Sequence, residues 1–424
     1  MILWGSKMSK LIIKGGKRLH GEIAVQGAKN SVLPILAATV LCNGESVIHN
    51  CPDLADVRIS FEILRSLGCK CSFTCGTAVV NTDRITSYSI PRSLMCEMRS
   101  SVIYLGAVIS RTGNAVISNP GGCNLGPRPI DMHICALEKM GVVFRCMDDR
   151  LTCCTPKGLH GAEIELPFAS VGTTENIILA AVKARGITVI KNAAREPEIV
   201  DLADFLNKCG AKIHGAGTQK ITIYGVNKLH GTQHTVIPDR IAACTYLAAA
   251  AQTGGSVVLK NVIPRHFESF SHSLEKMGCV IFSSENKIKL TSAKRLKSIK
   301  FTQTDVYPGF PTDAGPLLVS LLCTADGDSV FEENIFKNRF NFVYELQKMN
   351  ADICICKNKA IINGVEKLCA SKLFCTDLRA GAAVVNAALC AAGESIVENI
   401  CFIDRGYENI EKNLSALGAD IKRI

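Results

Sequence analysis

Cys123 lies in a segment whose composition favours a reactive thiol. It follows Gly121 and Gly122 and precedes a Gly-Pro-Arg-Pro run, so its neighbours are glycines and polar residues instead of an apolar core run. A cysteine in such a segment is expected to be exposed, and nearby cations lower the pKa of a thiol. We expect nearly all of the other cysteines to be buried, which leaves Cys123 as the cysteine best suited to chemistry.

Asp313 is a second candidate for chemistry, at the end of a Phe-Pro-Thr-Asp segment with the composition of a turn. An aspartate in a turn usually accepts hydrogen bonds from the local backbone. In a closed site, a carboxylate within reach of a substrate proton can instead act as a general base. Taken alone, the segment favours the first interpretation.

The length and composition predict a globular protein of two domains. A chain of 424 residues is too long for one ordinary core, and 47% hydrophobic with 20% charged residues is typical of globular proteins. No apolar stretch reaches the roughly 18 residues that a membrane span needs. The apolar start at residues 1–4 is too short for a signal peptide. We therefore expect a cytoplasmic protein without membrane insertion.

The net charge of +10 is compatible with simple solubility or with attraction of anionic ligands. No lysine or arginine run, aromatic RNA-binding motif or zinc finger is present, which disfavours nucleic acid as a partner. The 21 cysteines show no disulfide-scaffold pattern and fit a reducing cytosol. Close spacings such as Cys69/Cys71 and Cys354/Cys356 lack a Cys-x-x-Cys pair, so we interpret them as core packing on one strand face, without a metal.

A unit of about 70 residues occurs six times along the chain. One part of it reads as the end of a helix that runs into a strand, with glycine, or once Asn350, directly after the helix. Glycine and then asparagine are the residues that best adopt the left-handed conformation at this position. The six copies begin at Leu64, Leu137, Leu206, Leu274, Leu346 and Leu414.

A second part of the unit ends in an asparagine and precedes loops rich in glycine, proline and charge. The asparagines are Asn50, Asn119, Asn192, Asn261, Asn334 and Asn399. Helices rich in alanine and leucine come before them, and helices that are apolar all round must be buried. We therefore predict an α/β fold with helices inside and short sheets outside, three units in each domain. A single doubly wound sheet fits the paired helices less well.

The loop motifs resemble those of the UDP-N-acetylglucosamine enolpyruvyl transferase (1-carboxyvinyltransferase) family, from about Leu11 to Ile424. The motifs are Gly27-Ala-Lys-Asn30, Met98-Arg-Ser100, Pro120-Gly-Gly-Cys-Asn-Leu-Gly-Pro-Arg-Pro129, Ser170-Val-Gly172, Ala194-Arg-Glu-Pro-Glu-Ile-Val-Asp201, Pro238-Asp-Arg240, Phe310-Pro-Thr-Asp313, Thr376-Asp-Leu-Arg379 and Asp404-Arg-Gly-Tyr-Glu408. Each motif is weakly specific by itself, whereas all of them in order are highly specific.

The resemblance implies a two-domain inside-out α/β barrel built from six repeats, the enolpyruvyl transferase fold. One discontinuous domain would comprise residues 1–28 and 238–424, including the chain termini. The other would comprise residues 29–237 and carry the catalytic loop around Cys123. The substrate site is expected in the cleft between them.

The resemblance also implies which cations bind the anionic substrate phosphoenolpyruvate: Lys29, Arg99, Arg128, Arg379 and Arg405. Arginine forks suit both the phosphate and the carboxylate of this molecule. Arg128, Arg379 and Arg405 would hold the phosphate and the carboxylate. Lys29 would help to stabilise the charge that develops during the reaction. Without the resemblance, each lone arginine would be interpreted as a solvated surface charge.

The chemistry that the resemblance implies is addition followed by elimination, with no metal and no organic cofactor. Asp313 would take the proton of the 3-hydroxyl of UDP-N-acetylglucosamine, and the hydroxyl would attack C2 of phosphoenolpyruvate. Cys123 would protonate the methylene carbon and would be the residue that fosfomycin alkylates. Lys29 and Arg405 complete the catalytic set. Loss of phosphate would leave the enol ether, the first committed step of peptidoglycan synthesis and so of cell wall biogenesis.

The residues that the resemblance assigns to the UDP-sugar are Asn30, Arg128, Ser170, Val171, Gly172, Asp313 and Ile335. The small residues from Ser170 to Thr174 let backbone N–H groups approach a diphosphate, although the segment alone reads as a turn between a strand and a helix. Asp377 would orient the charged cluster or shuttle a proton, and Glu196 is a weaker candidate for the same network.

One segment departs from the family pattern. The family usually has Met or Leu and then Gln after Phe-Pro-Thr-Asp, whereas this chain has Ala314-Gly315-Pro316, which could shift Asp313. A non-catalytic, regulatory UDP-sugar-binding paralogue therefore stays open as an alternative. A second alternative is enolpyruvyl-shikimate-phosphate synthase-like activity, against which the loop cysteine and the Asp-Arg-Gly-Tyr-Glu segment argue. The oligomeric state is left unassigned.

Overall fold

The computed structural model describes residues 9–118, 120–121, 130–147 and 150–424. Contacts within the chain divide these residues into two compact units. Unit 1 contains the N-terminal residues through Gln26 together with Pro238–Ile424, and unit 2 contains the described residues between 27 and 237. The chain passes from one unit to the other at residues 26–27 and 237–238.

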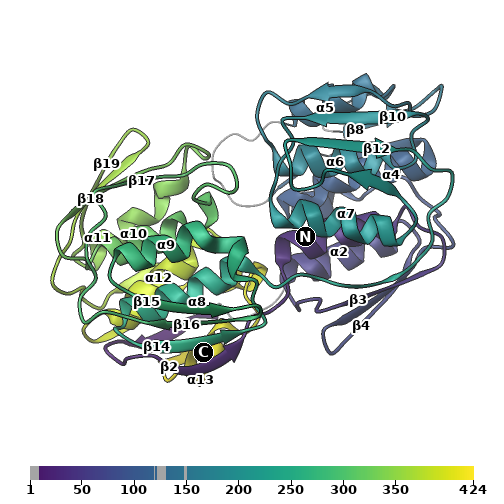
Figure 1. Cartoon of the computed structure of the whole chain (residues 1–424). Coiled ribbons are helices and arrows are strands. Elements are labelled where there is room, and N and C mark those ends of the chain that lie inside the picture. Colours follow the sequence, from purple (N-terminus) through teal and green to yellow (C-terminus); the bar gives the residue numbers. More distant parts are fainter. Residues whose placement is uncertain (1–8, 119, 122–129, 148–149) are drawn as a thin grey trace. The chain divides into compact units, whose positions relative to one another are not determined.

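Three small mixed sheets form the strand layer of unit 1 (Figure 1). Their strands, in spatial order, are β21 (Lys372–Phe374), β22 (Glu394–Glu398), β1 (Leu11–Lys14) and β23 (Asp420–Arg423); β15 (Val280–Ser284), β16 (Lys287–Thr291), β14 (Ser256–Lys260) and β2 (His20–Ala24); and β17 (Phe301–Gln303), β18 (Asp328–Glu332), β20 (Lys359–Asn363) and β19 (Asp352–Cys356). The first sheet joins the two ends of the chain, because β1 pairs antiparallel with the C-terminal strand β23.

Unit 2 repeats this arrangement with three further sheets. Their strands, in spatial order, are β11 (Lys212–His214), β12 (Lys220–Tyr224), β10 (Ile187–Lys191) and β9 (Glu163–Glu165); β13 (Gln233–Thr235), β3 (Glu45–His49), β5 (Thr77–Asn81) and β4 (Lys70–Thr74); and β6 (Asn114–Ser118), β8 (Arg150–Cys154) and β7 (Val143–Met147). In the two four-stranded sheets a parallel pair at one edge joins antiparallel pairs elsewhere, as between β9 and β10.

Helices with almost no exposed face occupy the interior of each unit (Figure 1). They are α8 (Arg240–Gln252), α10 (Gly315–Leu322) and α12 (Leu378–Cys390) in unit 1, and α1 (Lys29–Thr39), α4 (Tyr104–Thr112) and α6 (Val171–Ala181) in unit 2. All residues of α10, and all of α12 except Cys390, are buried. The structure confirms the prediction of buried helices with sheets outside them, because these sequences have no polar face to turn to water.

A second set of helices is amphipathic, and each of these helices ends at a left-handed residue. They are α2 (Ala55–Ser66), α5 (Asp131–Lys139), α7 (Pro197–Lys208), α9 (Glu268–Lys276), α11 (Val343–Lys348) and α13 (Ile410–Ala416). The residues that follow are Gly68, Gly141, Gly210, Gly278, Asn350 and Gly418, with φ between 67° and 100°. The prediction for this position is confirmed, since only glycine and asparagine adopt such a φ readily.

The asparagines of the repeat have a structural role that the sequence did not reveal. The side-chain Nδ2 of each described one donates to a backbone carbonyl at the end of a neighbouring segment. Asn50, for example, donates to Val236 at 2.9 Å, and Asn261 donates to Val25 at 2.7 Å. Four of the five also have positive φ, Asn334 being the exception. The repeated asparagine therefore fixes where each loop leaves its sheet.

The expectation that nearly all other cysteines are buried is wrong. Among the twenty described cysteines, all free, eight are exposed: Cys75, Cys96, Cys135, Cys146, Cys354, Cys356, Cys369 and Cys401. Cys354 and Cys356 share one face of β19, as predicted, but that face is the solvent-exposed one. Alternation along a strand places two residues on the same face without deciding which face packs on the core.

The helices of the described residues are all too short or too polar to serve as a transbilayer segment.

Candidate active site

The Asp313 carboxylate is the centre of an ion-pair cluster in unit 1. It lies in the short helix η3 (Thr312–Ala314), directly before α10. Its Oδ1 accepts from Nη2 of Arg339 at 2.8 Å, and its Oδ2 lies 3.3 Å from both Nε and Nη2 of Arg379. The Asp313 side chain keeps 28% of its surface exposed, whereas both guanidinium groups are almost fully buried. The cluster thus holds a partly accessible carboxylate between two buried cations.

Arg339 is the member of this cluster that the sequence analysis missed. It begins the short helix η4 (Arg339–Phe342), and its guanidinium lies 5.0 Å from the centre of the Phe336 ring. Its Nε donates to Oγ1 of Thr312 at 3.1 Å. The sequence contains a weak signal for Arg339, because the segment between residues 336 and 340 is one of the charged loops that follow a repeat asparagine, here Asn334.

The Glu333 carboxylate binds the two segments that carry Asp313 and Arg339. Its Oε2 accepts from the Thr312 hydroxyl at 2.8 Å, and its Oε1 accepts from the backbone N–H of Ile335 at 2.7 Å and of Phe336 at 3.0 Å. Ile335, expected to contact the UDP-sugar, is half-buried here. One buried carboxylate therefore fixes both the η3 turn and the loop that leads to Arg339.

The charges around Asp313 decide its protonation state. Burial raises the pKa of Asp313, but the guanidinium groups of Arg379, Arg339 and Arg240 outweigh burial and hold this pKa well below its ordinary value. Asp313 in turn raises the pKa of Arg379 above its ordinary value, against the effect of burial. The carboxylate is therefore ionised and able to accept a proton, and its basicity grows when a guanidinium pair loosens.

Aspartates cap the two helices that deliver arginines to this region. Oδ1 of Asp377 accepts from the backbone N–H groups of Arg379 and Ala380 at 2.9 and 3.0 Å, which begins α12. Oδ1 of Asp239 accepts from the backbone N–H groups of Ile241 and Ala242 at 2.9 Å each, which caps α8 at its first residue, Arg240. The Asp377 carboxylate also lies 3.9 Å from Arg339. Its position therefore favours the orienting role over proton transfer.

Arg405 ends the short helix η5 (Ile400–Arg405) and is half-buried. Two residues further on, the Tyr407 hydroxyl lies 2.8 Å from the Thr245 hydroxyl and accepts from Nη1 of Arg379 at 3.4 Å. The Asp-Arg-Gly-Tyr-Glu segment is thereby tied to α8 and α12 inside unit 1.

The departure at Ala314-Gly315-Pro316 is absorbed locally. Gly315 begins α10, and Pro316 occupies the first turn, where a missing N–H costs nothing. A Cβ on Gly315 would come within 3.0 Å of the Phe331 ring, so the glycine fits close packing behind Asp313. The residue change therefore leaves a regular helix start beside the carboxylate.

Unit 2 carries the remaining described candidates, beginning with Lys29. This residue opens α1, and its Nζ lies 2.7 Å from Oδ2 of Asp56 in the first turn of α2. Both side chains are nearly buried, with 10% and 2% exposed. Asn30, beside it, is half-buried. Asp56 is a further residue that the sequence analysis missed, because an aspartate at a helix start usually serves only the helix dipole.

Asp201 joins the start of α1 to the end of unit 2. Its carboxylate accepts from the hydroxyl of Ser31, pairs with Nε2 of His234 at 2.8 Å, and accepts from the backbone N–H of Ile237 at 3.2 Å. All of these residues except Ile237 are buried. The Ala194–Asp201 motif thus positions the segment next to Lys29 and Asn30.

Ser170 begins α6 as its N-cap, with Oγ accepting from the backbone N–H of Thr173 at 3.4 Å. Val171 and Gly172 follow in the first turn and are partly exposed. The segment that by itself read as a turn is therefore the N-terminus of a buried helix. This end of a helix carries partial positive charge and suits an anion.

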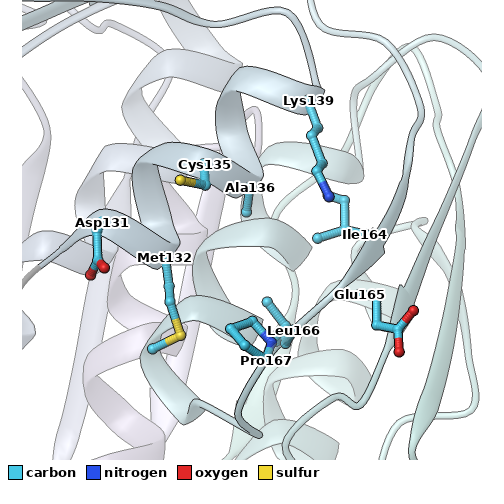
Figure 2. Close-up of a pocket in the computed structure, with 9 residues that line it drawn as sticks. All are labelled: Asp131, Met132, Cys135, Ala136, Lys139, Ile164, Glu165, Leu166 and Pro167. Carbon is cyan, nitrogen blue, oxygen red and sulfur yellow. The ribbon is translucent and has the colours of Figure 1, made fainter.

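A pocket lies next to this helix start in unit 2 (Figure 2). Its lining comes from α5 and from the segment that contains β9, namely Asp131, Met132, Cys135, Ala136, Lys139, Ile164, Glu165, Leu166 and Pro167. Figure 2 shows Asp131 and Met132 at one end of α5, with Pro167 nearby across the pocket. Pro167 precedes Ser170 by three residues.

Arg99 begins the short helix η1 (Arg99–Ile103) in unit 2 and is half-buried. Cys123 and Arg128 lie outside the described residues. Glu196 precedes α7, and Glu196 and Glu198 both raise the pKa of Glu175, which burial raises most. The described residues contain no group of three metal-ligating side chains.

The chain is similar to one protein family over nearly its whole length. A family model described as EPSP synthase (3-phosphoshikimate 1-carboxyvinyltransferase) matches residues 13–414. The enolpyruvyl transferase NikO from Streptomyces tendae has a similar fold, with a TM-score of 0.88 at 24% identity over 98% of each chain. Two structures of EPSP synthase from Acinetobacter baumannii each give a TM-score of 0.75, at 18% and 19% identity, over 98% of this chain and 99% of their own.

Curated relatives are more similar in sequence. UDP-N-acetylglucosamine 1-carboxyvinyltransferase 2 of Caldanaerobacter subterraneus is 50% identical over 419 residues, covering 98% of this chain and 100% of the relative. UDP-N-acetylglucosamine 1-carboxyvinyltransferase 1 of Symbiobacterium thermophilum is 45% identical over 420 residues, covering 98% of this chain and 95% of the relative.

Proposed function

The chain belongs to the enolpyruvyl transferase family and, within it, to the UDP-N-acetylglucosamine 1-carboxyvinyltransferases, and we propose from this premise how its residues work. Its activity is transfer of the enolpyruvyl group of phosphoenolpyruvate to UDP-N-acetylglucosamine with release of phosphate. The observation that carries this conclusion is 50% identity along essentially the full length of both chains. The reaction serves peptidoglycan synthesis.

We propose that Asp313 is the general base for the sugar 3-hydroxyl. The low pKa that its guanidinium partners impose keeps it ionised, and its side chain is partly exposed, so that it can receive the proton. Arg379 would bind phosphoenolpyruvate, with Arg405 holding the other anionic group of the same substrate. Contact of Arg379 with the substrate would draw it away from Asp313 and so raise the basicity of the carboxylate.

Lys29 would stabilise negative charge that develops on phosphoenolpyruvate during addition, with Asp56 holding its ammonium in place at 2.7 Å. Asn30, Arg99, Arg128, Ser170, Val171, Gly172 and Ile335 are proposed contacts of the substrates. Cys123 is proposed as the acid that protonates the methylene carbon. The hydroxyl attacks C2 and a tetrahedral ketal forms. Loss of phosphate from C2, together with return of a proton from the new methyl group to the Cys123 thiolate, leaves the enol ether. None of these steps requires a metal or organic cofactor.

The test is phosphate release from phosphoenolpyruvate with each acceptor offered separately. Release with UDP-N-acetylglucosamine, abolished by preincubation with fosfomycin, is the expected result. Release with shikimate 3-phosphate alone would assign the sister activity that gives the matching family model its description. Binding of UDP-N-acetylglucosamine without any phosphate release would identify a regulatory paralogue. A Cys123→Ser variant supplies the matched control, since it keeps the loop but loses the reactive thiol.

We also propose a cytoplasmic location, because both substrates are soluble anionic metabolites and the chain resembles enzymes that act on them. Fractionation of cells that express the protein tests this location. Recovery with the membrane pellet after a high-salt wash would contradict it.

A further inference from the structure

His133 is a buried polar side chain that the proposed mechanism leaves without a role. It lies in the first turn of α5, and only 6% of its surface is exposed. Its ring packs beside the start of α6, because a Cβ placed on Gly172 would lie 3.4 Å from its Cε1 and 3.8 Å from its Nε2. The Cε1–Nε2 edge of the imidazole therefore faces the N-terminal turn of α6.

Asn176 determines which nitrogen of this histidine carries the proton. Its Oδ1 accepts from the backbone N–H of Gly106 at 2.7 Å, and its Nδ2 donates to the carbonyl of Val102 at 2.9 Å. These two backbone groups fix the orientation of the amide, since the reverse would place two acceptors together. The second Nδ2 hydrogen points to Nδ1 of His133 at 2.7 Å. Nδ1 is consequently the acceptor, and the proton of the neutral ring resides on Nε2.

The Nε2–H of His133 has no hydrogen-bond partner among the residues that the structure describes, where Asn176 provides the ring's single hydrogen bond. The first backbone N–H groups of α6 are available in the same place. Thr174 donates to the carbonyl of Ser170 and Thr173 donates to its hydroxyl. The N–H groups of Val171 and Gly172 then have no acceptor among the described residues, as is usual for the first turn of a helix. An oriented imidazole donor and two backbone donors thus converge at one helix start.

We propose that His133 donates its Nε2–H to the diphosphate of the UDP-sugar, as a third donor beside the N–H groups of Val171 and Gly172. The inference rests on the proposed function, which supplies the ligand. A donor that is already oriented binds an anion without losing side-chain entropy on binding. His133 is then a determinant of UDP-sugar affinity, acting away from the reacting atoms.

The surroundings keep this donor neutral. Burial lowers the pKa of His133 most, the positive charge of Arg99 lowers it further, and Asp131 opposes both, so that the pKa falls to about 4. At neutral pH the ring therefore keeps a single proton, which Asn176 directs to Nε2. This arrangement gives the same donor across the physiological pH range.

The test compares binding of UDP-N-acetylglucosamine, measured by calorimetry, for the wild-type protein and for His133→Leu and His133→Gln. Leucine fills the space without a donor, so we expect its Kd to rise about 10- to 100-fold, as for loss of a hydrogen bond to an anion. Glutamine can place an amide N–H near the former Nε2 and should recover at least half of this loss on a logarithmic scale. Thermal unfolding of each variant checks that it folds.

Tyr104→Phe is the matched control, because Tyr104 is another buried side chain of unit 2, whose hydroxyl lies 2.7 Å from that of Ser60 and has no role in the proposed site. It should leave the Kd for UDP-N-acetylglucosamine within about threefold of wild type. An equal loss of affinity in Tyr104→Phe and His133→Leu would mean that His133 acts only through the packing of unit 2, which overturns the proposal. A His133→Leu variant that binds as wild type would overturn it as well.

A spectroscopic measurement separates a donor from a merely structural histidine. In protein labelled with nitrogen-15 in histidine, the imidazole signals missing from His133→Gln belong to His133. We expect protonated Nε2 in the free protein and a shift of that nitrogen on addition of UDP. Protonated Nδ1 would contradict the assignment. Failure of wild-type protein to bind the sugar nucleotide or release phosphate would instead reject the proposed function, with the tautomer result left standing.

Discussion

The two units handle polar groups in different ways. In unit 1, opposite charges form ion pairs: the carboxylate of Asp313 lies between Arg339 and Arg379. Unit 2 also contains buried pairs, such as that of Lys29 and Asp56, but the start of α6 is lined by neutral donors, among them the imidazole of His133. The first arrangement suits a group that must change its proton affinity. The second suits steady binding of an anion, because neutral donors require no counter-charge to be displaced.

The comparison also shows why the same repeat serves different purposes. Both units present the N-termini of buried helices, but α8 and α12 begin with aspartate caps whereas α6 begins with the neutral Ser170. An aspartate cap satisfies the first N–H groups and cancels the positive end of the helix, which leaves little for a ligand. A serine cap leaves that field available to an anion.

The largest expected effect is the loss of activity when Asp313, the centre of the charged cluster, is replaced by Asn. The amide keeps the shape of the side chain but accepts no proton, so kcat for phosphate release should fall by a factor of about 10² to 10⁴. Steady-state assays at saturating substrates measure this change. Retained binding of UDP-N-acetylglucosamine within a few-fold serves as the control. A loss smaller than tenfold would remove Asp313 from the role of general base.

Arg339→Met tests whether the buried pair stabilises unit 1. Removing this guanidinium leaves Asp313 with Arg379 and should lower the free energy of unfolding by roughly 2–4 kcal/mol, somewhat less than for a fully buried pair because the carboxylate is partly exposed. Urea denaturation followed by circular dichroism measures it. Arg295→Met is the matched control, since the exposed Arg295–Asp326 pair spans 3.5 Å and should contribute less than about 1 kcal/mol. Equal effects would contradict the comparison.

The neutral state of His133 predicts that the free energy of unfolding depends on pH through this residue of unit 2. The folded pKa of about 4 lies below the ordinary value of 6.5, so the unfolded chain binds the proton more readily. The contribution to stability is complete above pH 6.5 and is lost as the pH falls towards 4, by up to about 3 kcal/mol. Denaturation of wild type and His133→Gln between these pH values measures the difference. Parallel pH profiles for the two proteins would reject the prediction.

The smallest expected effects are on the free energy of unfolding when the helix caps Asp239 and Ser170 are removed. Asp239 accepts from two backbone N–H groups at 2.9 Å, whereas Ser170 accepts from one at 3.4 Å. Asp239→Ala should therefore lower the free energy of unfolding by about 1–2 kcal/mol and Ser170→Ala by about 0.5 kcal/mol. Thermal and chemical unfolding of the two variants measure both values. The reverse order would show that the α6 cap is the more important for stability.

Several features of the fold followed from the sequence because they depend on nearby residues. The glycines and the single asparagine after the outer helices adopt left-handed φ as predicted, and the helices rich in alanine and leucine are buried as predicted. The same reasoning failed for Cys354 and Cys356, since alternation specifies a shared face but not its neighbours. For the candidate site, the sequence identified motifs and not their partners. Asp56 and His133 carry no distinctive local pattern, and Arg339 carries only a weak one, so all three were missed.

The sequence by itself determined the repeat, the types of element and where they end, because backbone preferences and hydrophobic patterning act over a few residues. Only the tertiary structure decided which charges meet. Asp313 is separated from Arg379 by 66 residues and from Arg339 by 26, and His133 is separated from Asn176 by 43. The energy of an ion pair or a hydrogen bond depends on distances of a few ångströms and on local burial. These distances and this burial are set only when the buried helices pack together, because packing brings the loops at their ends close to one another.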